Sequence, residues 1–236
     1  MDVRKLTAEF VGALALIFIG AGSIVAAQAA GGGSGGSGLV TIALAHGLVI
    51  AVMVSAVGHV SGGHFNPAVT IGAWVTQKIS TVDAAGYLVA QLAGGAAGAG
   101  LLRLSIGEDL WGPVNLGTPA VASVSDGQAV LIEAILTFFL VWVIFATAID
   151  PEGAFGKVAG LAIGFTIALD IMMGGPFTGG AMNPARSFGP ALVSGSWTRH
   201  WIYWVGPVAG GVVAASVYDV AILRRRRPAP TVEMEP

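Results

Sequence analysis

Apolar residues run along this chain in six long stretches, which short polar or glycine-rich segments separate. The hydrocarbon core of a bilayer is about 30 Å thick and requires roughly 20 apolar residues per helix. Six stretches meet this requirement, although the fifth is short. We therefore expect six membrane-spanning helices, at about 7–28, 39–59, 84–104, 128–149, 157–174 and 202–223.

Basic residues flank the first and the last of these stretches. Arg4 and Lys5 precede the first, and Arg224 to Arg227 follow the last. Because lysine and arginine gather on the cytoplasmic side of membrane helices, both termini are expected to be cytoplasmic, which agrees with an even number of spans. The first stretch is longer than the apolar part of a signal peptide and lacks a convincing cleavage site. It is therefore predicted to be a retained helix.

The composition supports a membrane protein and excludes several other classes. Only 10% of the 236 residues are charged, where soluble domains carry about 25%. No charged residue occurs from Phe10 through Gln77. A soluble enzyme, a nucleic-acid-binding protein and a disordered chain are excluded, and membrane lipid is the expected surrounding. The chain has no cysteine and no spacing typical of metal ligands, so we expect no metal and no cofactor.

The chain contains an internal repeat. Residues 61–70 and 178–187 share Gly-Gly and Asn-Pro-Ala at an offset of 117, and each precedes an apolar stretch too short to span. Glu9 and Glu133 lie near the start of each half. Each half then holds three spans and one re-entrant segment, and because three is odd, the second half inserts upside down. We expect one domain over residues 1–236, with halves at about 1–108 and 126–226 and a cytoplasmic tail at 227–236.

The repeated Asn-Pro-Ala sequences are suited to starting a helix. Asparagine is a preferred N-cap, and proline fits the first helical position because its missing N–H is not needed there. Two half-helices are therefore expected to begin at Asn66 and Asn183. Each asparagine oxygen would accept from free helix amides, which leaves its NH₂ group free to donate into an aqueous pathway. The motif residues are Asn66, Pro67, Ala68, Asn183, Pro184 and Ala185.

These motifs identify a resemblance to the aquaporin (major intrinsic protein) family over essentially the whole chain. The family implies an all-α bundle of six transmembrane helices and two re-entrant half-helices, assembled as a homotetramer with one pore per subunit. It also implies passive conduction of water or small neutral solutes, with no catalytic step. In this family reading, Glu9 and Glu133 accept hydrogen bonds from loop amides near the half-helices. The resemblance is carried by Glu9, residues 59–70, Glu133, residues 183–190 and residues 200–207.

The resemblance also bears on the solute. Ser187, Ala191 and the pair Tyr203-Trp204 stand where glycerol-conducting relatives carry other residues, so glycerol is disfavoured. The family's outer constriction maps onto His46, Ile171, Gly180 and Arg186. This set resembles plant tonoplast intrinsic proteins that pass ammonia as well as water.

One feature of those ammonia-conducting relatives is missing here. They also carry a histidine in the third outside loop, and the corresponding position lies near Thr118. The expected permeants are water and ammonia, with a water-only channel as the alternative and a glycerol facilitator as a weaker one.

Other functions remain as weaker alternatives. The intramembrane carboxylates invite a proton relay, and a proton-coupled secondary transporter would also use an inverted repeat. The His-Glu-x-x-His motif of metallohydrolases is not present. His59, His64 and His200 are expected to be structural, and Asp170 either biases cation access at the outer mouth or pairs locally. The short N-terminus favours a prokaryotic plasma membrane.

Overall fold

A computed structural model describes residues 2–33, 35–153 and 158–224. The arginines at 225–227 and the expected tail at 227–236 lie outside the described residues. Within the described part, six helices are long and apolar enough to cross a membrane, and they confirm the six predicted spans. These helices are Val3–Ala29, Gly36–Ser61, Thr81–Ser105, Asp126–Ile149, Ala159–Thr178 and Ile202–Leu223.

Three of the six spans contain a π-helical segment. The first span joins α1 (Val3–Ala15), the π-helical η1 (Leu16–Ala21) and α2 (Gly22–Ala29) without a break. The fourth and sixth instead end in a π-helical turn, where η3 (Phe145–Ile149) follows α7 (Asp126–Ile144) and η5 (Asp219–Leu223) follows α10 (Ile202–Tyr218). The remaining spans are α3 (Gly36–Ser61), α5 (Thr81–Ser105) and α8 (Ala159–Thr178).

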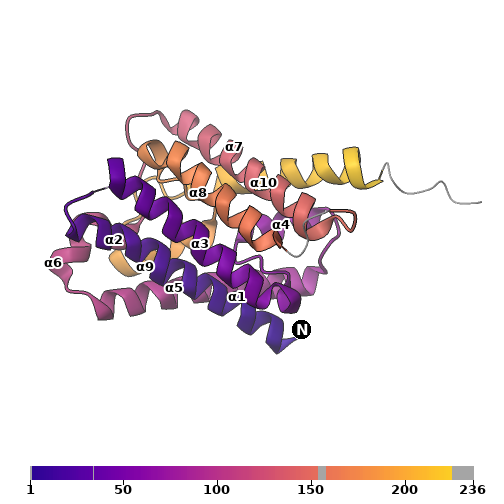
Figure 1. The fold of residues 1–236 in the computed structure, drawn as a ribbon, viewed down its shortest axis with the longest axis horizontal. Helices are drawn as coiled ribbons and strands as arrows, with labels where there is room; N and C mark the ends of the chain where they lie inside the picture. Colours follow the sequence, from indigo (N-terminus) through magenta and orange to yellow (C-terminus); the bar gives the residue numbers. More distant parts are fainter. Residues whose placement is uncertain (1, 34, 154–157, 225–236) are drawn as a thin grey trace, which may run out of the picture.

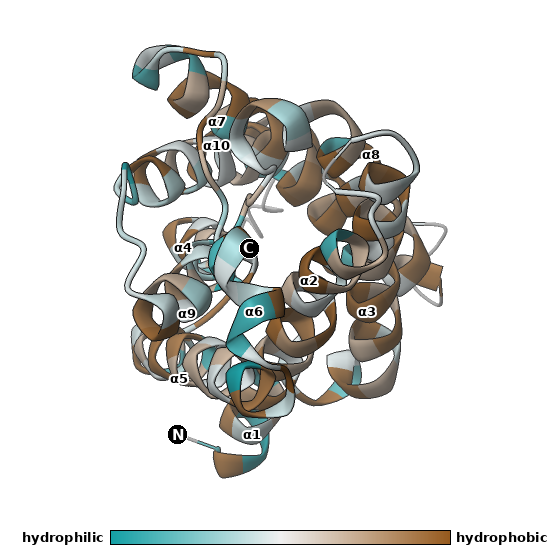
Figure 2. Ribbon diagram, turned by 90° about the vertical axis from the view of Figure 1, so that its left-hand side faces the viewer, coloured by the Kyte–Doolittle hydropathy of each residue, from teal (hydrophilic) through white to brown (hydrophobic). Residues whose placement is uncertain are grey.

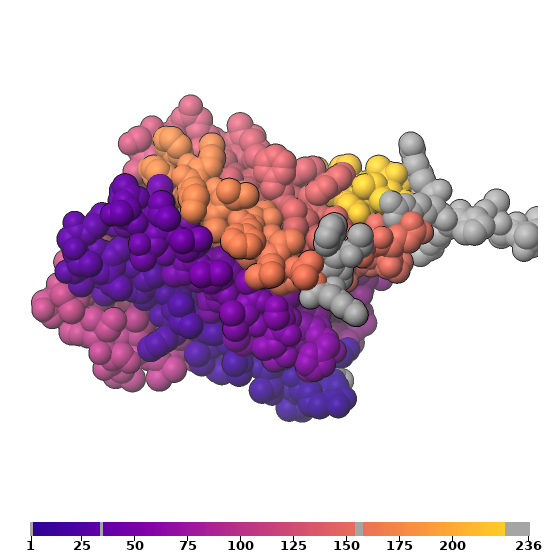
Figure 3. Space-filling model, viewed as in Figure 1, coloured from indigo at the N-terminus to yellow at the C-terminus, as the bar shows by residue number. Residues whose placement is uncertain are grey.

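The helix packing repeats between the two halves. Helix α1 packs on α5 in the first half, as α7 packs on α10 in the second, and α3 and α8 join the halves. In Figure 3 the side chains of α8 fill the space between α3 and α7. The start of α1 and the end of α10 lie at the same end of the bundle, while α6 (Glu108–Trp111) lies at the other (Figure 1). The first and the last span therefore have their outer ends on one side, as an even number of spans requires.

Glycines let equivalent helix pairs approach closely in both halves. A Cβ on Gly94 of α5 would meet the carbonyl oxygen of Phe10, and one on Gly210 of α10 would meet that of Ala134. Close backbone approach is how helices associate in lipid, where apolar side chains alone provide little driving force. The long helices are coloured mainly as hydrophobic, whereas α6 carries hydrophilic residues (Figure 2). Large apolar side chains such as Val52, Val89 and Leu169 are exposed on the outside of these helices.

Two short helices enter the bundle without crossing it. Helix α4 (Pro67–Val75) packs on α10, and α9 (Pro184–Ser194) packs on α5. The predicted caps are present, because Asn66 Oδ1 accepts from Ala68 N at 2.9 Å and Asn183 Oδ1 accepts from Ala185 N at 2.9 Å. The fold is therefore all-α, with one re-entrant half-helix in each of two inverted halves.

The loops before both half-helices have matching left-handed backbones. Gly62, Gly63 and Phe65 have φ of 90°, 65° and 48°, and Gly179, Gly180 and Met182 have 85°, 55° and 52°. Glycine adopts this conformation without the steric cost of a Cβ. The Gly-Gly pairs of the repeat therefore allow the chain to turn back at membrane depth.

Candidate functional site

Glu9 holds the loop before the first half-helix. This fully buried carboxylate on α1 accepts from His64 N at 3.0 Å and from Phe65 N at 2.7 Å. It also accepts from Ser61 Oγ at 2.6 Å and Gln91 Nε2 at 2.7 Å. A loop of irregular backbone inside a membrane needs such acceptors, because no lipid atom can satisfy its N–H groups.

Glu133 does the same for the second half-helix. It is fully buried on α7 and accepts from Ala181 N at 2.9 Å and Met182 N at 2.7 Å. Its third donor is Thr178 Oγ1, at 2.7 Å. The two acids thus have the loop contacts that the resemblance implies.

The two capping asparagines tie the halves together at the centre. Asn66 Nδ2 donates to Met182 O at 2.9 Å, and Asn183 Nδ2 donates to Phe65 O at 2.9 Å. The expectation that both NH₂ groups are wholly free is therefore corrected. One N–H of each amide is used across the interface between the halves, which leaves the other for a molecule in the cavity.

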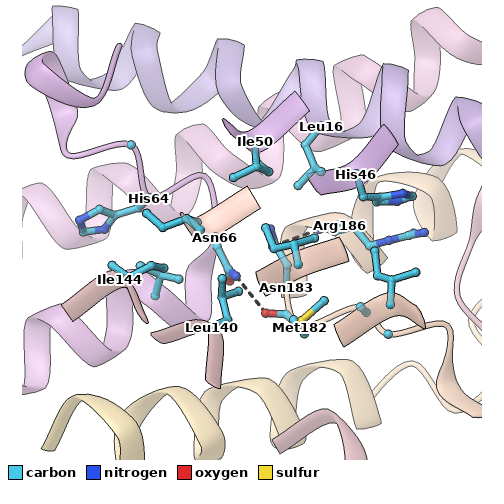
Figure 4. Close-up of a pocket in the computed structure, with 17 residues that line it drawn as sticks. Leu16, His46, Ile50, His64, Asn66, Leu140, Ile144, Met182, Asn183 and Arg186 are labelled. Carbon is cyan, nitrogen blue, oxygen red and sulfur yellow. Dashed lines mark hydrogen bonds between the residues drawn. The ribbon is translucent and has the colours of Figure 1, made fainter. Parts of the chain in front are cut away.

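A narrow cavity of about 30 Å³ runs past both asparagines. His46 and Arg186 lie side by side toward one end, while His64 and Ile144 lie toward the other (Figure 4). The expected constriction residues Ile171 and Gly180 also line it, and a Cβ on Gly180 would lie 3.2 Å from Ile171 Cα. The lining comprises Leu16, His46, Ile50, Gly63, His64, Asn66, Val69, Leu140, Ile144, Ile163, Ile167, Ile171, Gly180, Ala181, Met182, Asn183 and Arg186.

His46 offers a hydrogen-bond acceptor at this end of the cavity. Its Nδ1 lies 2.9 Å from the carbonyl oxygen of Ile42, and since a carbonyl only accepts, Nδ1 carries the proton. In the neutral imidazole, Nε2 is then an acceptor, and it is buried with no hydrogen-bond partner among the described residues. Sequence alone gives no tautomer; the helical carbonyl one turn away sets it.

Arg186 offers donors beside it. Nη1 of this buried side chain donates to Gly117 O at 2.8 Å, and its Nε is buried without a partner in the described part of the chain. Arg186 also sits on the first turn of α9, where a cation is electrostatically unfavourable. Helix stability does not account for it, and Arg186 forms no ion pair with another described residue.

The charge pattern favours small neutral molecules over cations. Two half-helix N-termini, each equivalent to roughly +0.5 charge, meet near Asn66 and Asn183. Arg186 adds a full positive charge, and no carboxylate is among the lining residues. Most of the remaining wall is apolar and cannot replace the hydration shell of an ion.

Sequence reasoning missed the residue that anchors Arg186. Gly117 ends η2 (Gly112–Gly117), in which Asn115 and Leu116 are left-handed with φ of 46° and 57°. An asparagine and a glycine two residues apart after Pro113 signal such a turn, but not its target. Nearby, Thr118 Oγ1 donates to Asn115 O at 2.6 Å, and Thr118 does not line the cavity.

Asp170 follows neither expectation. It is buried on α8 beside Ile171, but it does not line the cavity and forms no ion pair with a described residue. Its Oδ2 has no hydrogen-bond partner in the described part of the chain. Nothing in the structure explains this carboxyl.

The three other histidines differ in their surroundings. His64 lines the cavity, and its Nδ1 lies 3.0 Å from Thr70 Oγ1. His200 packs edge-on against Trp197, with ring centroids 4.7 Å apart. Like His59, it is not among the lining residues.

Comparisons with known proteins agree with this geometry. The family model described as Major intrinsic protein matches residues 1–218. Aquaporin TIP4-4 of Zea mays is 47% identical over 220 residues, which cover 92% of this chain and 86% of the relative. Probable aquaporin TIP3-2 of Arabidopsis thaliana is 45% identical over 230 residues, covering 94% and 85%. The solved structure of the aquaglyceroporin from Plasmodium falciparum superposes with a TM-score of 0.81 at 26% identity, covering 94% of this chain and 98% of that one.

Proposed function

Because the chain belongs to the major intrinsic protein family, we propose that the cavity between its half-helices is the pathway of the channel. The protein is an integral multi-pass membrane protein, a passive water channel and not an enzyme. In this proposal, the two asparagines orient permeating water at the centre. His46, Ile171, Gly180 and Arg186 form the selectivity filter, and Glu9 and Glu133 are structural.

The observation that carries the proposal is the pair of unpartnered groups at one end of the cavity. His46 Nε2 accepts and Arg186 Nε donates, and both are buried. Water and ammonia each donate and accept, so either can replace its hydrogen bonds to bulk water there. A cation meets the fixed charge of Arg186 and loses its hydration against apolar walls.

We propose that ammonia passes as well as water. Ile171 gives the filter an apolar wall and Gly180 adds no side chain, which lowers the advantage of water over a slightly less polar molecule. The set resembles that of ammonia-conducting tonoplast intrinsic proteins, and the relatives reported above are named as TIP aquaporins. The water-only alternative is favoured by Thr118, whose hydroxyl is bonded within its own loop.

Proteoliposome fluxes separate these candidates. Stopped-flow light scattering compares water, glycerol and urea, and a trapped pH dye follows ammonia. Under an ammonia gradient, the lumen should become alkaline faster than in empty liposomes. The double variant His46→Phe with Ile171→His should abolish this excess while sparing water flux. Good water flux without any ammonia excess in the unmodified protein would leave the water-only channel.

The remaining alternatives are weaker. A proton-coupled transporter would need a titratable carboxylate in the pathway, whereas Glu9 and Glu133 are occupied by loop donors. A glycerol facilitator is disfavoured by Ser187, Ala191 and Tyr203, although one structural neighbour is an aquaglyceroporin.

The organisation and assembly are also proposals. One channel domain covers residues 1–236, with inverted halves at about 1–108 and 126–226, and four copies form a homotetramer with a pore in each. Light scattering of the detergent-solubilised protein measures the copy number directly. Both termini are cytoplasmic in this account. The prokaryotic plasma membrane stays a prediction, and the plant relatives give it no support.

A further inference from the structure

The imidazole of His46 packs against Gly20, a glycine that belongs to no sequence motif. Gly20 is buried in the π-helical segment η1, on the helix facing α3. A Cβ built on Gly20 would lie 2.7 Å from His46 Cδ2 and 2.9 Å from its Nε2. Real Cβ atoms essentially never approach other atoms so closely, so the ring and a side chain at position 20 cannot both occupy their places.

The ring has little freedom to move away. Its Nδ1 is bound to Ile42 O at 2.9 Å, and the side chain is only 2% exposed. Moving the ring breaks that bond and carries Nε2, the acceptor of the filter, into the space of the permeant. Gly20 does not have a positive φ, and glycine within a helix costs about 1 kcal/mol relative to alanine. Glycine is therefore needed at position 20 because it has no side chain, and not because its backbone is flexible.

The second half of the chain has a different residue at the equivalent place. At the 124-residue offset between Glu9 and Glu133, Leu16 corresponds to Leu140, and both line the cavity. Gly20 corresponds to Ile144, which lines the cavity with its own side chain. The two halves thus differ at this position, because only the first half must leave space for an imidazole beside the pathway.

We propose that Gly20 is a specificity-determining residue of the channel, because its missing side chain makes the space in which His46 lies. This inference rests on the proposed role of His46 in the filter. A side chain at position 20 displaces the imidazole from its place and narrows the pathway, and this effect disappears when the imidazole is removed.

The test is a double-mutant cycle measured as water and ammonia flux per incorporated protein. The variants are Gly20→Ala, His46→Ala and both together, with Gly100→Ala as the matched control. A Cβ at Gly100 would meet no atom within 4 Å, so this variant should conduct like the unmodified protein. Gly20→Ala should lower water flux several-fold, and in the His46→Ala background it should change nothing.

The outcomes distinguish a failure of the inference about Gly20 from a failure of the proposed filter role of His46. Equal losses from Gly20→Ala in both backgrounds would overturn the inference, since the added methyl would then act elsewhere. The inference would also be overturned if Gly20→Ala left the flux unchanged while His46→Ala altered the ratio of ammonia to water flux. That result would still support the proposed filter role of His46. If His46→Ala alters neither flux, the filter role of His46 fails, and the role of Gly20 fails with it.

If a variant does not fold, the yield of folded protein is the measurement that tests the inference. If Gly20→Ala fails to fold but the double variant folds, the clash with the imidazole is supported. If neither folds, the added methyl clashes with something other than His46, and the inference is overturned.

Discussion

Removing the carboxylate of Glu133 should detach the second re-entrant loop from the bundle. Glu133→Ala leaves the amides of Ala181 and Met182 without an acceptor in a buried region. The Thr178 hydroxyl has a second, longer contact with Gly174 O at 3.4 Å, so it keeps part of its bonding. The loss therefore falls mainly on two backbone N–H groups.

The size of the effect follows from those two groups. Each buried donor left unsatisfied costs about 1–3 kcal/mol, so the variant should lose about 2–6 kcal/mol. The lower bound already changes the ratio of ordered to displaced loop by about 30-fold. Met182 O is the acceptor of Asn66 Nδ2, so a displaced loop also releases the central asparagine. Water flux should fall together with stability.

Thermal unfolding in detergent and stopped-flow water flux measure the two consequences. The midpoint of unfolding should fall by at least about 4 °C. Glu108→Ala is the control, since Glu108 is exposed at the start of α6 and should change neither quantity. A Glu133→Ala protein with unchanged midpoint and unchanged flux would refute the loop-holding role.

Four further variants test the pathway. Asn66→Asp and Asn183→Asp each replace the NH₂ group, with both of its N–H donors, by a negatively charged oxygen at a half-helix N-terminus. They should therefore admit cations or reduce water flux, as ion-leak and stopped-flow assays would reveal. Arg186→Val should keep the fold but leak protons, measured with a trapped pH dye; a folded variant as proton-tight as the parent would contradict its role. Asp170→Asn should leave water flux and proton exclusion unchanged, because Asp170 does not line the cavity; a new leak would place it in the pathway.

The spans and the two caps could be predicted because local physics determines them. Six apolar stretches need a bilayer, and Asn-Pro at 66–67 and 183–184 suits a helix start whatever surrounds it. The cross-bonds from Asn66 to Met182 and from Asn183 to Phe65 could not be predicted, because each joins residues more than a hundred positions apart. Their geometry depends on how the halves dock.

The less predictable parts of the site depend on neighbours that periodicity does not reveal. In the sequence, Gly20 is one of many small residues, and its importance follows only from the position of the His46 ring beside it. Gly117 lies in a loop, and its role as acceptor for Arg186 exists only after α9 has entered the bundle. Neither periodicity nor the packing of neighbours explains the buried carboxyl of Asp170, whose Oδ2 has no hydrogen-bond partner among the described residues.

The most direct test of a passive, proton-excluding water pathway is osmotic shrinkage of proteoliposomes, followed with and without an imposed pH gradient. The account predicts fast water flux with a low activation energy, independent of any ion gradient, and no acidification of the lumen beyond that of empty liposomes. Water flux no faster than in empty liposomes, or flux accompanied by protons, would contradict it.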